Sequence, residues 1–257
     1  MVDSVLMAEL SWPEWQARIA ANTPVLLPVG STEQHGPHLP LGVDVVLPTA
    51  VSERIARALG AIVAPTITYG YKSQPRSGGG QDFPGTTSLS LATMVLVVRD
   101  IIHDLGLHGV RRLAVINGHY ENTPAIVEGI DVALRELKRD GIAGMSVVRL
   151  DYWDFVRRQT LDTLFPAGFP GIDLEHASLL ETSLMLLVRP DLVEMAKVPS
   201  DGPAKFPTYD RSPTPAGLVP PSGVLAVAHG STAESGQLLM DDYVALITAA
   251  LRAEFAS

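Results

Sequence analysis

The sequence predicts an α/β fold in which a mostly parallel sheet is built from strand–helix–strand crossover units. Short apolar runs that end at Gly or Pro alternate along the chain with segments of helical periodicity. Acidic and histidine side chains follow directly after two of these runs, which is where ligands gather in open parallel sheets. With 257 residues, 46% of them apolar, and no internal repeat, the chain is expected to form one domain over residues 1–257.

The expected elements follow from local pattern and from residues that start or stop a segment. Buried strands are predicted at residues 24–29, 61–65, 112–116 and 145–150. Helices are predicted at residues 48–59, 90–105, 124–138 and 232–255. Pro48 and Pro124 suit a first helical position, and Ser90 suits a helix cap. The Gly-rich segment 69–85 and the Pro-rich segment 200–223 are expected to be irregular, the second as a surface or subunit-contact loop.

Composition narrows the partners and the chemistry. Nineteen basic against 28 acidic residues give a formal charge of −9, without any basic cluster interleaved with aromatics, so nucleic-acid and anionic-membrane partners are disfavoured. The absence of cysteine excludes disulfides, thiolate ligands and a cysteine nucleophile, so any metal must be held by nitrogen and oxygen. The acidic N-terminus does not resemble a signal peptide, and no apolar run is long enough to cross a bilayer, so a cytoplasmic location is expected.

Two carboxylate–imidazole pairs carry the main functional signal. Glu33 and His35 are two residues apart, as are His119 and Glu121, and Asp44 adds a further carboxylate. Residues two apart in extended backbone point to the same side, so each pair presents an acid and an imidazole to a common point. Oxygen and imidazole donors in this number suit two divalent ions with Asp44 between them. The alternative is that these side chains are solvated or cap helices, and the pattern favours a binuclear metallohydrolase.

Other polar signals are weaker. His38 lies three residues after His35, and a supporting or loop-packing role is favoured over ligation. The remaining histidines, which lack acidic or histidine partners at ligand spacing, are interpreted as surface or core residues: His103, His108 and His229. The three glycines at 78–80 lack the following helix of a phosphate loop and indicate close approach of backbone to a substrate or subunit. A serine hydrolase is disfavoured, since no nucleophile elbow surrounds Ser178 or Ser183.

The run EQHGPHLPLGVD together with NGHYEN resembles the creatininase (creatinine amidohydrolase) family. The likeness covers residues 10 to about 195, with further matching segments in YGYKSQPRSGGGQDFPGTTSL, DYWDFV and IDLEHASLLETSLML. It implies a three-layer α/β/α sandwich, a homohexamer, and two ions per subunit, zinc and/or manganese. By motif, Glu33, Asp44 and His119 are implied to bind one ion. His35, Asp44 and Glu121 are implied to bind the other.

The resemblance also implies roles for the segment D-x-E-H-x4-E. His176, oriented by Glu181, would move a proton, with Glu121 also placed among the catalytic residues; Glu175 and Asp173 would hold the substrate. The other substrate contacts implied by motif are Ser77, Tyr120 and Trp153. Creatininase itself carries tryptophan immediately before the aspartate of this segment, where this chain has Ile172, so one wall of the substrate pocket differs.

The function predicted from these signals is metal-dependent opening of a small cyclic amide, foremost the reversible conversion of creatinine plus water to creatine. One alternative is a relative with the same chemistry acting on another cyclic amide, a formamide or a peptide bond. A second alternative, from another class, is a metal-binding oligomer without turnover. Glu175, His176 and Glu181 argue against that second alternative, because a scaffold needs no proton relay.

Overall fold

The computed structural model describes residues 4–256 and has a parallel sheet of four strands in the order β2-β1-β3-β4. The expectation about a leader rests partly on residues 1–3, which lie outside the described residues. The strands are β1 Val25–Val29, β2 Ile62–Val63, β3 Arg112–Asn117 and β4 Ser146–Asp151. All four predicted strands are confirmed to within a few residues.

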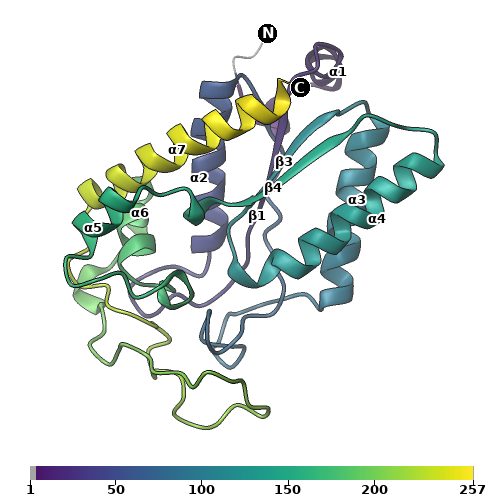
Figure 1. Cartoon of the computed structure of the whole chain (residues 1–257). Helices are drawn as coiled ribbons and strands as arrows, with labels where there is room; N and C mark the ends of the chain where they lie inside the picture. Colours follow the sequence, from purple (N-terminus) through teal and green to yellow (C-terminus); the bar gives the residue numbers. More distant parts are fainter. Residues whose placement is uncertain (1–3, 257) are drawn as a thin grey trace.

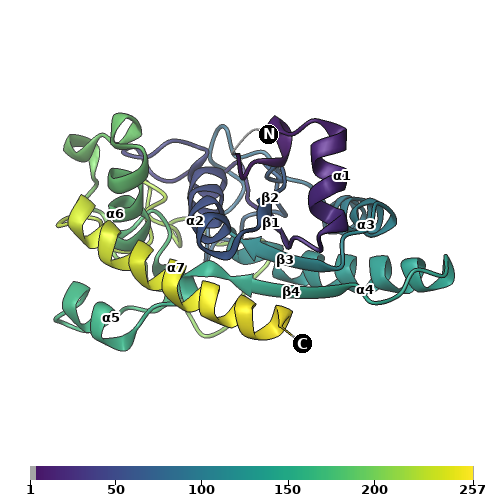
Figure 2. The same ribbon diagram turned by 90° about the horizontal axis from the view of Figure 1, so that it is seen from above.

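Helices cover both faces of the sheet, so the molecule has three layers (Figures 1 and 2). The helices are α1 Trp12–Ala20, α2 Val43–Leu59, α3 Leu91–Leu107, α4 Thr123–Arg139, α5 Arg158–Leu164, α6 Leu179–Val188 and α7 Ala233–Phe255. Alternate residues of each strand enter separate cores. Leu26 packs in the core with α2, α6 and α7, whereas its neighbours Val25 and Leu27 pack in the core with α3 and α4. The predicted α/β/α sandwich is therefore confirmed.

The predicted start of one helix is wrong, and the difference affects the site. Helix α2 begins at Val43 rather than at Pro48, so Asp44 lies in its first turn. Proline inside a helix leaves the carbonyl four residues earlier without its N–H partner. That carbonyl belongs to Asp44, and a Cβ at Gly30 would lie only 2.2 Å from its oxygen. The lack of a side chain at Gly30 therefore lets the end of β1 pack against the start of α2.

Other helical predictions agree better. Ser90 caps α3 by accepting from the Thr93 N–H, as expected, and α7 begins directly after its cap residue Thr232. Helices α1, α5 and α6 were not predicted. The Pro-rich stretch 200–223 is irregular, as predicted. Among the described residues, no helix combines the length and apolar character needed to span a bilayer.

Candidate metal and catalytic site

The two halves of the sequence motif meet at the carboxyl end of the sheet. Glu33 and His35 lie in the loop after β1, and His119 directly follows β3, the strand paired with β1. Asp44 reaches the same place from the first turn of α2. Although 75 residues separate them in the chain, His119 Nδ1 and Asp44 Oδ2 are 2.9 Å apart. The expected convergence of the two loops is confirmed.

One cluster contains Glu33, Asp44 and His119, all buried. His119 Nδ1 lies 2.8 Å from Glu33 Oε2 and 2.9 Å from Asp44 Oδ2. The other ring nitrogen, Nε2, is 3.0 Å from the carbonyl oxygen of Tyr71, to which it donates a hydrogen bond. This bond fixes the proton on Nε2 and leaves the Nδ1 lone pair facing the two carboxylates, the arrangement of a metal-binding histidine.

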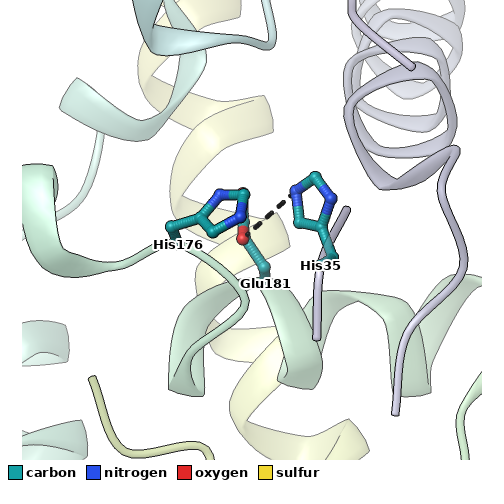
Figure 3. A group of neighbouring side chains, drawn as sticks. All are labelled: His35, His176 and Glu181. Carbon is teal, nitrogen blue, oxygen red and sulfur yellow. Dashed lines mark ion pairs between the residues drawn. The ribbon is translucent and has the colours of Figure 1, made fainter. Parts of the chain in front are cut away.

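A second cluster contains His35, His176 and Glu181 (Figure 3). His35 Nδ1 donates to the backbone carbonyl of Glu33 at 3.1 Å, which leaves Nε2 as the free ligand atom. His35 Nε2 is 3.1 Å from Asp44 Oδ1 and 3.7 Å from Glu181 Oε2. Asp44 therefore directs one carboxylate oxygen at each cluster. Its position between the clusters is that of a bridging ligand.

Glu121 lies apart from the second cluster. Its Oε1 accepts hydrogen bonds from the Gln74 N–H at 2.8 Å and from Ser77 Oγ at 2.6 Å. Its Oε2 is 3.3 Å from His119 Nε2, on the side of that ring opposite to Asp44. The described contacts thus place Glu121 beside His119 and place Glu181 beside His35.

Burial and missing partners indicate what the clusters can hold. Buried ligand atoms without a hydrogen-bond partner within residues 4–256 include Glu33 Oε2, His35 Nε2 and Glu121 Oε2. Glu33 Oε2 is within ion-pair distance of His119 but without hydrogen-bond geometry. Burial raises the pKa of Glu33 to about 7, because its charged form lacks solvation. The two clusters fit divalent cations well, because they concentrate carboxylate charge and offer nitrogen and oxygen donor atoms that lack partners.

The surrounding charges also perturb the two imidazoles of the clusters. Burial lowers the pKa of His35, but Asp44 and Glu181 outweigh it and raise this pKa well above its usual value. His119 behaves likewise, with Glu33 and Glu121 overcoming the effect of burial on its pKa. A positive charge is thus strongly favoured at this point. A divalent ion would supply that charge in place of the protons.

His176 is held in one tautomer by Gln34, a residue the sequence interpretation did not use. The Gln34 amide donates its two hydrogens to the carbonyls of Gly78 at 3.1 Å and Gly223 at 3.0 Å. It has none left for His176 Nε2, which instead donates to the Gln34 backbone carbonyl at 2.9 Å. Burial lowers the pKa of His176 well below its usual value. The ring is therefore neutral at neutral pH, with Nδ1 as the nitrogen that accepts a proton.

Glu175 precedes His176 and is also buried. Its Oε2 accepts the Leu180 N–H at 2.9 Å, whereas Oε1 has no partner among the described residues. Burial raises the pKa of Glu175 to about 8, an effect that the bond from Leu180 opposes. Asp173, by contrast, lies in the 3-10 helix η4 (Ile172–Leu174) and is half-buried.

A cavity of about 50 Å³ opens beside both clusters. All of the predicted substrate residues except Asp173 line it: Ser77, Tyr120, Trp153, Ile172, Glu175 and His176. The Tyr120 and Trp153 rings stack with centroids 6.5 Å apart. Asp173 lines a wider outer groove of about 840 Å³, together with Tyr209 and Arg211 of the Pro-rich stretch. Ser77, Tyr120, Trp153 and Ile172 border both spaces, so the groove leads to the cavity.

Supporting residues in the two loops escaped the sequence interpretation. Ser73 donates to Glu33 Oε1 at 2.7 Å. Asn122 accepts from the Tyr71 N–H at 2.8 Å and donates to the Gly30 carbonyl at 3.0 Å. These bonds fix Tyr71, whose carbonyl accepts the hydrogen bond from His119 Nε2. Asn122 lies in the run NGHYEN, so a search for side chains near the predicted ligands would have selected it. Ser73 lies in the matching segment YGYKSQPRSGGGQDFPGTTSL, but 40 residues separate it from Glu33, so spacing gave no sign of the contact.

The glycine triplet approaches the site as a close backbone contact. A Cβ at Gly78 would lie 2.0 Å from Glu33 Oε1 and 2.3 Å from Ser73 Oγ. Any side chain at this position would displace the Glu33 carboxylate. The Gly78 backbone therefore approaches the Glu33 side chain of this chain, whereas approach of the triplet to a substrate or a neighbouring subunit stays a prediction.

The other histidines have ordinary partners. His38 is buried, with Nε2 3.0 Å from Thr182 Oγ1, and burial lowers its pKa to about 4. His103 Nε2 lies 2.9 Å from Asp140 Oδ2 at the surface, a partner that sequence spacing did not indicate. His229 Nε2 lies 3.1 Å from Ser200 Oγ.

Comparison with known proteins places this fold and site among enzymes that hydrolyse amides. The family model Creatininase: Creatinine amidohydrolase matches residues 8–251. Creatinine amidohydrolase of Pseudomonas putida is 51% identical over 257 residues, covering 99% of each chain. The mycofactocin precursor peptide peptidase of Mycolicibacterium smegmatis is 34% identical over 65% of this chain and 58% of its own length.

Solved structures agree with this placement. A creatininase structure with Mn has a TM-score of 0.97 and 50% identity, covering 99% of this chain and 100% of the other. A glutamate-to-glutamine variant of creatininase of the Zn–Zn type has a TM-score of 0.97 and 49% identity, with the same coverage. The fold and the paired clusters define a hydrolase of the metal-dependent amidohydrolase class. Within that class, the chain belongs to the creatininase family.

Proposed function

We propose that this protein hydrolyses creatinine to creatine with two divalent ions, zinc or manganese, in each subunit. The observation that carries the proposal is the Asp44 carboxylate, which directs one oxygen at each of two ligand clusters beside a cavity. The likeness over the whole chain to the Pseudomonas putida creatinine amidohydrolase supports the choice of substrate. In the reaction, a C–O bond forms from water to the ring carbonyl carbon, and the C–N bond of the ring amide breaks.

Glu33, Asp44 and His119 would hold one ion, and His35 and Asp44 would hold the other. The resemblance implies Glu121 as the third ligand of the second ion. The distances favour Glu181, because its Oε2 is 3.7 Å from His35 Nε2 while Glu121 contacts Gln74 and Ser77. Metal analysis of Glu181→Gln and Glu121→Gln decides between them, since the variant that lacks the true ligand retains about one equivalent.

The residues around the ions would bind the ring and move the proton. Two divalent ions supply Lewis-acid polarisation of a carbonyl and activation of water at neutral pH. His176 accepts the proton of the attacking water at Nδ1 and passes it to the departing ring nitrogen, a step typically worth about 10² to 10⁴ in rate. Glu175 and Asp173 bind the guanidine-like end of the substrate, and Ser77 contacts the substrate near Glu121. Tyr120, Trp153 and Ile172 flank the ring.

The test is creatinine hydrolysis by metal-stripped protein to which Mn²⁺ or Zn²⁺ is added back. We expect activity only after addition, and we expect His176→Ala to keep two equivalents of metal while kcat falls about 100-fold or more. His108→Ala, at the exposed end of α3, is the matched control and should behave as wild type. Metal-loaded wild type without creatinine turnover contradicts the proposed substrate.

A larger amide is the second candidate, and two observations favour it. Ile172 stands where creatininase carries tryptophan, and the outer groove of about 840 Å³ exceeds the needs of one small ring. A peptide peptidase also belongs among the relatives. If creatinine is the substrate, Ile172→Trp should raise kcat/KM for it, since an indole covers a flat ring better than a sec-butyl group. If it does not, and short peptide amides or larger cyclic amides turn over faster, the second candidate replaces the first.

The assembly and the location are proposed from the same resemblance. We place the protein in the cytoplasm as a homohexamer that acts on a small molecule, without nucleic-acid or membrane partners. The formal charge of −9 supports the proposal that nucleic acids and membranes are not partners. Sedimentation equilibrium of the purified protein tests the hexamer, and a monomer mass contradicts it.

A further inference from the structure

The cavity is lined by two polar groups that lack hydrogen-bond partners within the described residues. Tyr243, on α7, is fully buried, and its hydroxyl forms no hydrogen bond. Glu175 is 4% exposed, and its Oε1 forms none either. Both residues line the same cavity of about 50 Å³. Buried polar atoms are rarely left unpaired, so a pair at one cavity points to a ligand.

The two groups influence each other, and Glu181 acts electrostatically on both. Glu175 is the charged residue with the largest effect on Tyr243, whose pKa burial raises. Leu180 and Leu184 line the same space, and the Tyr152 ring meets the Tyr243 ring edge-on with centroids 5.3 Å apart. Ring packing accounts for an aromatic residue at position 243. It does not account for the hydroxyl, which phenylalanine would lack at no cost to that packing.

In the ionised form of Glu175 the remaining oxygen is an acceptor, and the Tyr243 hydroxyl is a donor. An amidine presents the complementary pair, an N–H donor and a lone-pair nitrogen on one carbon. We propose that Tyr243 is a specificity-determining residue, which donates to the lone-pair nitrogen of an amidine-bearing ring while Glu175 accepts its N–H. The inference rests on the proposed function and deepens it, because the amidine is what distinguishes creatinine from a simple lactam.

Tyr243→Phe tests the inference, because it removes one oxygen and keeps the ring. Thr248→Val is the matched control. It also removes a buried, unpartnered hydroxyl from α7, at a position that does not line the cavity. The measurements on metal-loaded protein are KM and kcat for creatinine, and the inhibition constant of 2-pyrrolidinone, a lactam of the same ring size without an amidine. Metal content and melting temperature are measured on each variant.

We expect Tyr243→Phe to raise KM for creatinine about 3- to 30-fold, the range for one lost hydrogen bond, with two equivalents of metal retained. Inhibition by 2-pyrrolidinone should change less than twofold, and Thr248→Val should match wild type in both. Equal KM values for the two variants overturn the inference. Equal weakening of creatinine and 2-pyrrolidinone by Tyr243→Phe also overturns it, because that result indicates a general packing effect.

Failure of the proposed function gives a different pattern. If wild type with two ions does not hydrolyse creatinine, the proposed function fails, and calorimetric binding of creatinine then tests the inference directly. Binding that weakens in Tyr243→Phe but not in Thr248→Val supports the role of Tyr243. Absence of binding to wild type, or equal binding to both variants, overturns it.

Discussion

At the scale of single residues, the position of Asp44 places one carboxylate between the two candidate metal clusters. Its oxygens lie 3.1 Å from His35 Nε2 and 2.9 Å from His119 Nδ1. Burial raises the pKa of Asp44, but His35 and His119 outweigh it and hold this pKa well below its usual range. The carboxylate is therefore ionised throughout the physiological pH range and available to both ions.

Asp44→Ala should lose both ions, because each cluster loses one of its ligands and the charge that the two share. Elemental analysis after dialysis should give well under one equivalent per subunit, against two for wild type. Asp104→Ala, which removes an exposed carboxylate from α3, is the control and should retain two. A full two equivalents in Asp44→Ala contradicts the bridging assignment.

The raised pKa of Glu175 makes stability depend on pH in a particular direction. Its pKa is about 8 in the folded protein, against 4.5 for an ordinary glutamate. Between these values the folded state keeps a proton that the unfolded state has lost, so the free energy of unfolding falls as pH rises from about 5 to about 8. Above about pH 9 the contribution of Glu175 no longer changes.

Glu175→Gln removes this dependence, because an amide does not titrate. In metal-stripped protein, the stability of wild type relative to Glu175→Gln should therefore fall across pH 5 to 8, as measured by urea unfolding at each pH. Glu194→Gln, an exposed surface change, should follow wild type. Parallel profiles for wild type and Glu175→Gln contradict the raised pKa.

Residue-scale prediction from the sequence selected side chains that gather at one place, but the geometry assumed for the pairs is wrong. Glu121 lies in the 3-10 helix Tyr120–Asn122 and not in extended backbone, and Glu33 and His35 belong to different clusters. The neighbours that orient them come from distant parts of the chain. Glu181 Oε2 meets His35 Nε2 only because α6 packs beside α2, a tertiary contact that no spacing rule contains.

At the scale of elements, strands were predicted better than helices for a physical reason. Buried parallel strands are continuous apolar runs, and those of this chain are bounded by Gly or Pro. Helix α6 is apolar around most of its surface and lacks the periodic pattern that identifies a surface helix. The start of α2 was misplaced because proline usually marks a first helical turn, whereas Pro48 lies in the interior of this helix.

A buried carboxylate of α7 binds the start of helix α5. Asp242 accepts hydrogen bonds from the Arg157 N–H at 2.9 Å and from Thr160 Oγ1 at 2.6 Å, and it pairs with the Arg157 guanidinium. Asp242→Ala leaves these donors unpaired and should cost about 2–3 kcal/mol in urea unfolding. Asp241→Ala, its exposed neighbour, should cost under about 0.5 kcal/mol. Equal losses in the free energy of unfolding for Asp242→Ala and Asp241→Ala contradict this role of Asp242.

At the scale of the whole molecule, we expect metal binding and folding to be coupled. The ligand atoms come together only in the folded chain, so ions stabilise the native state by mass action, about 2.7 kcal/mol per site at a hundredfold excess over Kd. Removing the metal from wild type should therefore lower Tm by roughly 5–10 °C or more. Adding Mn²⁺ or Zn²⁺ should restore it. Asp44→Ala should show no such response, and a wild-type Tm unaffected by chelation contradicts the coupling.

The hydrogen bonds of Gln34 have a consequence for how the chain acquires its activity during synthesis. The side chain of Gln34 reaches the carbonyl of Gly223, 189 residues later, and its backbone holds His176, 142 residues later. In a nascent chain that has not emerged past Gly223, the Gln34 amide lacks this hydrogen-bond partner. The tautomer of His176, which depends on that amide, is then not fixed. Contacts this distant in sequence form late and slowly. We therefore expect the proposed proton-transfer site at His176 to assemble only when nearly all of the protein has left the ribosome, and a product truncated before Gly223 to be inactive.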